Sequence, residues 1–383
     1  MKKNTITACL CLALSVAIMI YTGLNFLAAR ELPLPEWGPS VTEVKMLSEW
    51  FDGLEGTNGD TPVYVLEGKK PGGSMLILGG THANEVSGYM SAFTFIENAV
   101  VEEGTVYVIP YTNHSAMTHN DPSEGNLQYF TLTTASGERT FRYGSRATNP
   151  VDQWPDPDVY VHYPSGQQLS GSETRNINRA YPGRPDGNLT EKMAYGVASL
   201  IRAENIDLTF DLHEASPEYP VINATVAHQR AMNIAAEGCI NIMLDGIEMS
   251  LEQSPTNFHG LTHREWGDNS DINVAILMET ANASQGRLRG ATSIDQVLGG
   301  EDVCYEISQR LGMLYVPWTE GKAHPIEERC GRHLQGIYEY SQAYNEENQN
   351  RPVIYSGVPS YDDLYTNAAY EDLGGAQLAK FLK

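Results

Sequence analysis

Residues 74–88 read SMLILGGTHANEVSG, an apolar run that ends in two glycines and continues into His82 and Glu85. A short apolar run bounded by glycines is typical of a buried strand, and the apolar residues that follow recur at helical spacing. The stretch therefore predicts a strand, a tight turn and a helix. A His-x-x-Glu pair in that turn is either part of a metal site or an ordinary polar turn.

The same alternation of strand and helix continues along the chain. Apolar patterns predict further strands at 61–68, 104–113, 206–215 and 273–282, and helices at 87–100, 189–205 and 303–314. Strands that alternate with helices in this way are typical of an α/β sheet. At 383 residues the chain is long enough for one large α/β domain or two smaller ones.

The composition excludes two classes of partner. Lys and Arg total 25 against 48 Asp and Glu, so the formal net charge is −23. An acidic surface repels nucleic-acid backbones and anionic lipid surfaces, and neither is expected as the main partner.

The N-terminal segment is long and apolar. Residues 4–29 carry no charged side chain and follow Lys2 and Lys3. Such a stretch is long enough to span a bilayer, and the two lysines favour leaving the N-terminus in the cytoplasm. We expect residues 1–30 to be an uncleaved membrane anchor or a removed signal peptide, with a buried core helix as the third interpretation. In the first two cases the rest of the chain lies outside the cytoplasm.

The rest of the chain divides into three expected parts. Residues 31–60 read as a Pro-rich linker with a lead-in helix, 61–345 as the catalytic domain and 346–383 as a polar C-terminal tail. Within the catalytic domain, residues 113–174 lose periodicity but keep many aromatic residues. They are expected to form an ordered excursion over one rim of the sheet.

The cysteines allow at most one disulfide in the folded part. Cys9 and Cys11 lie in the apolar N-terminal segment, which leaves Cys239, Cys304 and Cys330. Of these three, Cys304 with Cys330 is the candidate pair.

Three predicted strands lead into groups that can bind a metal or move a proton. His82 and Glu85 follow the first strand, His213 follows the second and Glu279 the third. Open α/β sheets bind ligands beyond the carboxyl ends of their strands. Two imidazoles and one carboxylate form a ligand set for a catalytic zinc, which leaves Glu279 as general base against a zinc-activated water. Each group alone is more often structural, so the prediction depends on their joint placement.

A loop before the helix at 189–205 gathers polar and cationic side chains. Its sequence, TRNINRAYPGRPDG at 174–187, contains Arg175, Asn178 and Arg179. Guanidinium groups bind carboxylates bidentately and stabilise an oxyanion as it develops. The alternative is a solvated loop with a Pro-Gly turn.

Together these motifs resemble the zinc carboxypeptidase superfamily, and most closely its succinylglutamate desuccinylase/aspartoacylase branch. GGTHANE at 79–85 resembles the Gly-x-His-Gly-x-Glu motif of that branch, with Ala83 in place of the usual glycine. NINRAYPG at 176–183 is similar to its Asp-Leu-Asn-Arg-x-Phe-Pro-Gly, with Asn176 for Asp and Tyr181 for Phe. DLHEA and LMETAN resemble its histidine-bearing and glutamate-bearing strands. The resemblance covers roughly residues 60–300.

The resemblance implies one catalytic domain with a mixed central sheet flanked by helices, and one Zn²⁺ ion per chain. It implies His82, Glu85 and His213 as the zinc ligands and Glu279 as the general base. Asp211 lies two residues before His213 on the same strand face, where it either orients that imidazole or makes a strand-end salt bridge.

For the substrate, the resemblance implies that Asn178 and Arg179 hold a carboxylate. Arg175 is the first candidate for the oxyanion-stabilising arginine, with Arg142 and Arg146 as alternatives.

A second metal site is not expected at the other histidines. His259 and His263 lie near Glu265 in a loop-like segment, and we interpret both as rim residues.

These expectations combine in a zinc-dependent amide hydrolase of the deacylase or carboxypeptidase type. Its substrate would be an N-acyl amino acid or a peptide, cleaved next to a free carboxylate. An extracytoplasmic metallocarboxypeptidase acting on peptides or cell-wall stem peptides is one alternative. A non-catalytic peptide-binding relative is another, against which Glu279 argues, because a binding protein needs no general base.

Overall fold

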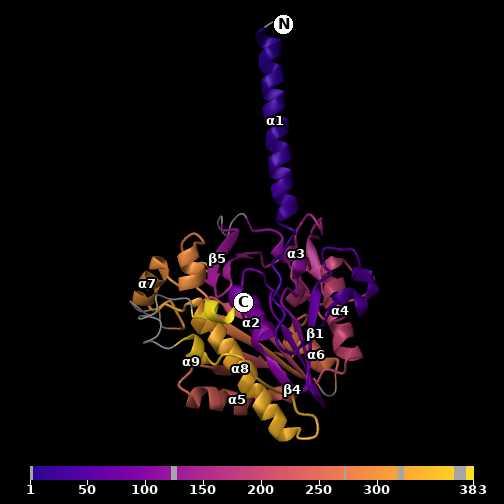
Figure 1. The fold of residues 1–383 in the computed structure, drawn as a ribbon, viewed down its shortest axis with the longest axis vertical. Coiled ribbons are helices and arrows are strands. Elements are labelled where there is room, and N and C mark those ends of the chain that lie inside the picture. Colours follow the sequence, from indigo (N-terminus) through magenta and orange to yellow (C-terminus); the bar gives the residue numbers. More distant parts are fainter. Residues whose placement is uncertain (1–2, 122–126, 271–272, 317, 319–322, 366–376) are drawn as a thin grey trace.

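The computed structural model describes residues 3–121, 127–270, 273–316, 318, 323–365 and 377–383. Within this part of the chain, a nine-stranded sheet forms the centre of the molecule (Figure 1). The strands lie in the order β1-β2-β4-β3-β9-β12-β10-β11, and β13 also pairs with β4. Their bounds are Val41–Met46 (β1), Pro62–Glu67 (β2), Lys70–Leu78 (β3), Val100–Ile109 (β4), Leu208–Ala215 (β9), Ala224–Ala227 (β10), Ser250–Gln253 (β11), Val274–Ala281 (β12) and Ile354–Ser356 (β13).

The sheet is mixed, as expected from the sequence. Strand β3 runs parallel to β4 and β9, and β9 runs parallel to β12, whereas β10 is antiparallel to β12. The carboxyl ends of β3, β9 and β12 therefore meet at one edge of the sheet. This is where an open α/β sheet presents its binding groups.

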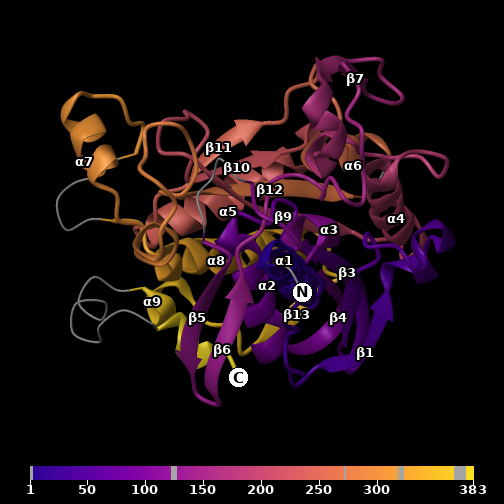
Figure 2. The same ribbon diagram turned by 90° about the horizontal axis from the view of Figure 1, so that it is seen from above.

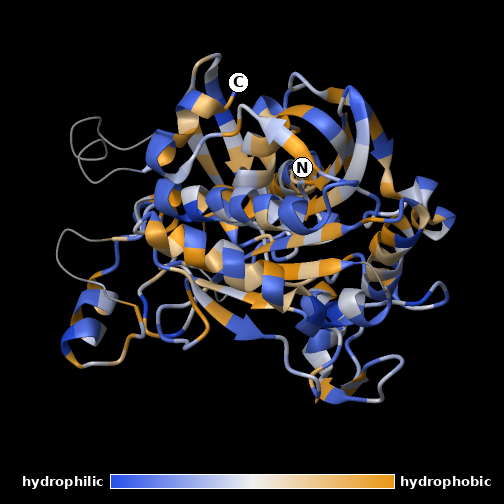
Figure 3. Ribbon diagram, turned by 90° about the horizontal axis from the view of Figure 1, so that it is seen from below, coloured by the Kyte–Doolittle hydropathy of each residue, from blue (hydrophilic) through white to orange (hydrophobic). Residues whose placement is uncertain are grey.

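Alternating residues of the strands build two cores, one on each face. Met75 and Ile77 of β3 pack in one core with helices α2 (Val86–Asn98), α5 (Met232–Leu244) and α8 (Ile326–Glu347). Leu76 and Leu78 pack on the other face with α4 (Leu189–Ala203) and with Trp266 of α6 (Thr262–Asp268). In Figure 3 the strands in the middle of the molecule carry mostly hydrophobic residues. The prediction of a central sheet flanked by helices is thus confirmed.

The excursion at 113–174 contains two small hairpins. Strands β5 (Tyr129–Thr134) and β6 (Gly137–Arg142) form one, and β7 (Val159–Val161) pairs with β8 (Gln168–Ser170) in the other. They lie on opposite sides of the molecule (Figure 2). The segment also contains the short helix α3 (His114–Met117).

Two local expectations are wrong. The lead-in helix expected within 31–60 is strand β1 followed by short 3-10 turns, because Val41–Met46 pairs with β2 at the edge of the sheet. The disulfide between Cys304 and Cys330 is absent, since both cysteines are free and Cys330 is buried in α8.

The C-terminal part of the chain packs against the domain where it is described. Helix α8 extends to Glu347, β13 pairs with β4, and the short helix α9 (Tyr361–Leu364) follows. Leu378 and Leu382 are buried in the core beside α2. Helix α7 (Val303–Arg310) is shorter than the helix expected at 303–314, because Gly312 adopts a positive φ of 68° just beyond it.

Helix α1 (Lys3–Ala28) projects from the rest of the molecule (Figure 1). Within the described residues it is the one helix long and apolar enough to cross a membrane. None of its residues is buried, so it contributes nothing to either core.

Candidate metal centre and active site

The turn after β3 brings α2 against β9. Gly80 has a φ of +63°, a conformation that side chains disfavour, and it redirects the chain toward Thr81. A Cβ at Gly88 in the first turn of α2 would lie 2.4 Å from the carbonyl oxygen of Leu212. Because both positions carry glycine, Glu85 at the start of α2 comes within reach of β9.

Ala83 occupies a position where the motif that this turn resembles has glycine, and another glycine accommodates its methyl group. Ala83 is fully buried, and its backbone N–H donates to the carbonyl of Ser145 at 3.0 Å. A Cβ at Gly144 would lie 2.4 Å from the Cβ of Ala83. The methyl group of Ala83 therefore occupies space that Gly144 leaves open.

His82, Glu85 and His213 converge on one point. Each offers one ligand atom, and these three atoms lie within 4.8 Å of one another. Nδ1 of His82 is 2.7 Å from Glu85 Oε1, and Nδ1 of His213 is 2.8 Å from Glu85 Oε2. All three side chains are at most 3% exposed. Two nitrogens and a carboxylate at this spacing fit a zinc ion, which takes tetrahedral His and carboxylate ligands.

Polar neighbours hold the outer nitrogen of each imidazole. Nε2 of His82 lies 3.0 Å from Asn176 Oδ1, and Nε2 of His213 lies 2.8 Å from Asp211 Oδ2. Both oxygens are acceptors, so with a metal at the shared point each ring would keep its proton on Nε2 and present the lone pair of Nδ1 to the metal, in place of the present contact between Nδ1 and Glu85. This is the tautomer that a metal ligand requires.

Asp211 is itself held in place. Thr81 donates to one of its carboxylate oxygens at 2.6 Å, and Thr262 donates to the other at 2.8 Å. Of the two interpretations of Asp211, the structure supports the one in which it orients His213.

The electrostatics of the three groups are coupled. Burial opposes a high pKa at His213, but the carboxylates of Asp211 and Glu85 raise its pKa well above the usual value. Burial and the nearby Arg146 guanidinium lower the pKa of His82 to about 4. Burial acts to raise the pKa of Glu85, yet the two histidines hold it below its ordinary value. The centre therefore holds a carboxylate that is strongly stabilised by positive charge.

Glu279 lies beside this cluster on the neighbouring strand. In β12 it is in register with His213 of β9, so both side chains leave the same face of the sheet. Burial, which outweighs the opposing charge of His213, raises the pKa of Glu279 to about 8. Its Oε2 atom is buried without a hydrogen-bond partner. A buried carboxyl group with an unused oxygen has the properties of a proton-transfer group.

A cavity of about 600 Å³ opens above these groups. His82, Glu85 and Glu279 line it together with Asn178 and Arg179. The Oδ1 atom of Asn178 accepts from the backbone N–H of Thr262, which begins α6. Burial, and then the charge of Arg146, lower the pKa of Arg179 to about 10, so this residue stays cationic at neutral pH.

The structure places Arg146, rather than Arg175, beside the metal-binding groups. Arg146 Nη1 lies 3.3 Å from His82 Nδ1 and 3.4 Å from Glu85 Oε1, and Arg146 lines the cavity. Arg175 binds Asp156 through two hydrogen bonds of 2.7 and 3.0 Å and does not line the cavity. The assignment of Arg175 to the oxyanion is corrected on this ground, because its guanidinium is already committed elsewhere.

Arg142, the other alternative, is also unavailable. It is buried, and its Nε donates to the carbonyl of Met117 at 2.9 Å. Its guanidinium lies over the ring of Tyr129 in the β5–β6 hairpin, and neither residue lines the cavity.

The loop histidines have separate partners. His259 Nδ1 lies 2.8 Å from Glu265 Oε1, whereas His263 Nδ1 lies 2.8 Å from Ser254 Oγ. Burial lowers the pKa of His263 to about 3, so its ring is neutral where it lines the cavity. Within the described residues, the one cluster of three metal-binding groups is that of His82, Glu85 and His213.

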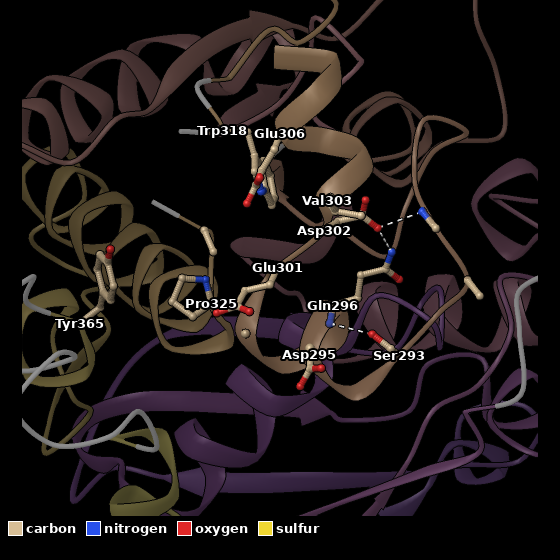
Figure 4. A pocket seen from close by; sticks show the side chains of 14 residues that line it. Ser293, Asp295, Gln296, Glu301, Asp302, Val303, Glu306, Trp318, Pro325 and Tyr365 are labelled. Carbon is tan, nitrogen blue, oxygen red and sulfur yellow. Dashed lines mark hydrogen bonds between the residues drawn. The ribbon is translucent and has the colours of Figure 1, made fainter. Parts of the chain in front are cut away.

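A larger cavity of about 730 Å³ lies elsewhere, beside the N-terminus of α7 (Figure 4). Its labelled acidic side chains are Asp295, Glu301, Asp302 and Glu306. Asp302 caps α7 by accepting from the backbone N–H of Cys304 at 2.7 Å. The size of a cavity therefore does not identify the candidate active site. The side chains that could bind a metal at the smaller cavity do identify it.

Several orienting residues escaped the sequence reasoning. Asn176 was noted for replacing Asp in a motif, and its contact with His82 explains why an oxygen acceptor belongs there. Thr81 directly precedes His82 in the sequence, which is a weak signal for its role. Nothing in the local sequence of Thr262 indicates that it binds Asp211.

Replacing Asp211 tests whether it positions a metal ligand. Asp211→Asn is expected to weaken zinc affinity by about 10–100-fold, because the amide lowers the basicity of His213. Affinity is measured by competition with a chromophoric chelator. The matched control is Asp156→Asn, which removes a carboxylate bound to Arg175 and should leave zinc affinity unchanged. Equal affinities in Asp211→Asn and wild type would contradict the positioning role.

Comparisons with known proteins were made at the levels of sequence and structure. No family model and no curated protein matches the chain. Among solved structures, it is similar to the product-bound ectoine utilization protein of Ruegeria pomeroyi, with 20% identity over 60% of this chain and 55% of that chain and a TM-score of 0.37. It is also similar to the tripeptide-bound cell shape determinant protein Csd4 of Helicobacter pylori, with 13% identity over 79% of this chain and 56% of that chain and a TM-score of 0.42.

A third similar structure is a succinylglutamate desuccinylase from a Silicibacter species, with 18% identity over 60% of this chain and 55% of that chain and a TM-score of 0.36. The chain spans about half the length of these solved structures. The structures similar to this chain thus include a member of the succinylglutamate desuccinylase branch, which its motifs at 79–85 and 176–183 resemble.

Proposed function

We propose that this protein is a zinc-dependent hydrolase that cleaves an amide bond next to a free carboxylate. The observation that carries the proposal is the convergence of His82, Glu85 and His213, whose ligand atoms lie within 4.8 Å of one another beside a cavity that Glu279 lines. One zinc ion per chain would be held by these three residues. N-acyl amino acids and peptides both present the required bond.

The bound metal and Glu279 have different roles in the proposed hydrolysis. A zinc ion held there would act as a Lewis acid toward the scissile carbonyl and a bound water, and its positive charge would favour the carboxylate form of Glu279. Glu279 accepts a proton from the attacking water as the water oxygen bonds to the carbonyl carbon. The same group then donates that proton to the leaving nitrogen as the C–N bond breaks.

The cationic residues bind and orient the substrate. Arg146 has its guanidinium beside the ligand set, where negative charge develops on the carbonyl oxygen. Asn178 and Arg179 lie in the same cavity and are proposed to hold the substrate carboxylate. Arg179 is braced for this role by its hydrogen bond to the carbonyl of Asn178 at 2.7 Å and by the Phe258 ring, 5.0 Å away.

The two arginines of the loop allow a matched test of substrate binding. Arg179→Met is expected to raise KM by about 10–100-fold, because a charge-assisted pair with a carboxylate contributes about 1.5–3 kcal/mol. Arg175→Met should leave KM and kcat near wild type, since its partner is Asp156 outside the cavity. Steady-state kinetics on N-acetyl amino acids and on dipeptides give both values and rank the two substrate classes. Loss of turnover in Arg175→Met, with zinc and fold intact, would restore the assignment made from sequence.

The apolar helix α1 is proposed to anchor the catalytic domain outside the cytoplasm. Its 26 residues are long and apolar enough to cross a membrane, and none is buried in the fold. We expect the protein to stay in the membrane fraction after a carbonate wash and to keep its original N-terminus. Recovery of soluble protein that begins near Arg30 would instead identify a removed signal peptide.

A further inference from the structure

The floor of the cavity is a row of side chains on three neighbouring strands. Leu277 of β12 is in register with Val226 of β10, and Val226 is in register with Glu252 of β11. Residues in register leave the same face of a sheet, and all three line the cavity. Glu279 lies two residues from Leu277 on that same face. The row therefore begins beside the proposed general base and extends to the edge strand.

The row changes from apolar to acidic along its length. Leu277 and Val226 are buried, whereas Glu252 is exposed at the edge of the sheet. Neighbouring strands lie about 4.8 Å apart and alternate residues about 6.7 Å apart, so the Cα of Glu252 lies roughly 12 Å from that of Glu279. Within the described part of the chain, the carboxylate of Glu252 has no ion pair and no hydrogen bond to another side chain, so it is free to bind a ligand.

The charges of the cavity are separated. Its cations are Arg146 and Arg179, and Arg146 lies against the ligand set, whose residues follow β3 (His82 and Glu85) or lie near the end of β9 (His213). Glu252 lies on β11 at the other end of the sheet order, three strands beyond β9. A ligand that fills this space meets positive charge, then an apolar floor, then a carboxylate.

Resting on the proposed function, we infer that the preferred substrate carries a cationic amine on the side chain of the residue that bears the free carboxylate. The aliphatic stem of that side chain lies over Leu277 and Val226, and its ammonium group pairs with Glu252. Lysine and ornithine have this chemistry. An acidic residue at the same place is disfavoured, because its carboxylate would face Glu252.

Matched substrates separate the charge from the stem. The full-length protein, loaded with zinc, is assayed on N-acetyl-L-lysine, N-acetyl-L-norleucine and N-acetyl-L-glutamate. Norleucine keeps the four-carbon stem of lysine without the ammonium group. Wild type is expected to favour the lysine substrate over the norleucine substrate by about tenfold in kcat/KM, as expected for a charge-assisted pair at a partly exposed site.

Variants of Glu252 test whether this residue causes the preference for lysine. Glu252→Gln should abolish the preference for lysine over norleucine, and Glu252→Lys should raise kcat/KM for the glutamate substrate. The control Glu301→Gln removes an equal charge from the larger cavity and should keep the preference for lysine. Equal turnover of lysine and norleucine substrates by wild type would overturn the inference and leave the proposed hydrolase in place.

A binding measurement keeps the inference testable if no amide is cleaved. Free L-lysine and L-norleucine are titrated into wild type and Glu252→Gln by calorimetry. If lysine binds more tightly than norleucine to wild type but not to Glu252→Gln, the Glu252 site is supported even when the proposed hydrolysis fails. Equal binding of the two amino acids to wild type would overturn the inference.

Discussion

Glu279→Gln is expected to lower kcat by about 10²–10⁴-fold, the usual contribution of a positioned general base. The amide has nearly the size of the carboxylate but cannot accept the proton of the attacking water. KM should change far less, because Arg179 and Asn178 still hold the substrate carboxylate. Zinc content should stay near one ion per chain, since the three proposed ligands are untouched. Elemental analysis and steady-state kinetics on the best amide substrate measure both quantities.

The companion variant His82→Ala separates metal binding from proton transfer. It removes a proposed ligand, so zinc content and activity should fall together. An active Glu279→Gln enzyme would show that another group is the base. A Glu279→Gln protein that has lost its zinc would instead place Glu279 among the ligands.

Arg329→Met is expected to lower the free energy of unfolding by about 3–5 kcal/mol, the cost of leaving a buried charge without its partner. Arg329 of α8 pairs with Glu214 at the end of β9, and both side chains are completely buried. Among the described residues, Asn282 would then be the remaining side-chain partner of Glu214, to which it donates at 2.7 Å. Arg329 also donates to the carbonyl of His324 at 3.1 Å, so α8 and the segment before it loosen as well. Urea denaturation followed by circular dichroism measures the loss.

Two further variants show whether burial causes the effect. Glu214→Gln combined with Arg329→Met should recover much of the lost stability, because no unpaired charge remains. Arg351→Met breaks a pair with Asp207 in which the arginine side chain is 47% exposed, and should cost only about 0–1 kcal/mol. A loss in Arg329→Met no larger than in Arg351→Met would refute the buried-pair argument.

The Glu214–Arg329 pair also shows where the motifs stop being informative. Their resemblance ends near residue 300, yet α8 packs against α2 and α5 and contributes Arg329 directly beneath the candidate site. No local pattern in α8 indicates that contact, because the two partners are 115 residues apart in the chain. Long-range ion pairs depend on how the helices are packed, which spacing alone does not encode.

Features that depend on local spacing could be predicted from the amino-acid sequence. A strand ending in Gly-Gly must turn, and His-x-x-Glu then places His82 and Glu85 three residues apart at the start of a helix. Apolar strands that lead into His213 and Glu279 meet the same edge of a parallel sheet, since parallel strands share their direction. The α/β architecture and the composition of the candidate site follow from these local rules.

Which polar groups complete the site depends on how distant segments of the chain pack together. Arg175, Arg142 and Arg146 are equally cationic in the sequence, and only packing pairs Arg175 with Asp156 and leaves Arg146 against Glu85. Side chains of β10 and β11 reach the cavity because those strands pair beside β12, across segments of the chain that share no motif. Local spacing determines which side chains a segment places on one face. The residues that those side chains contact depend on how the strands pair across the whole sheet.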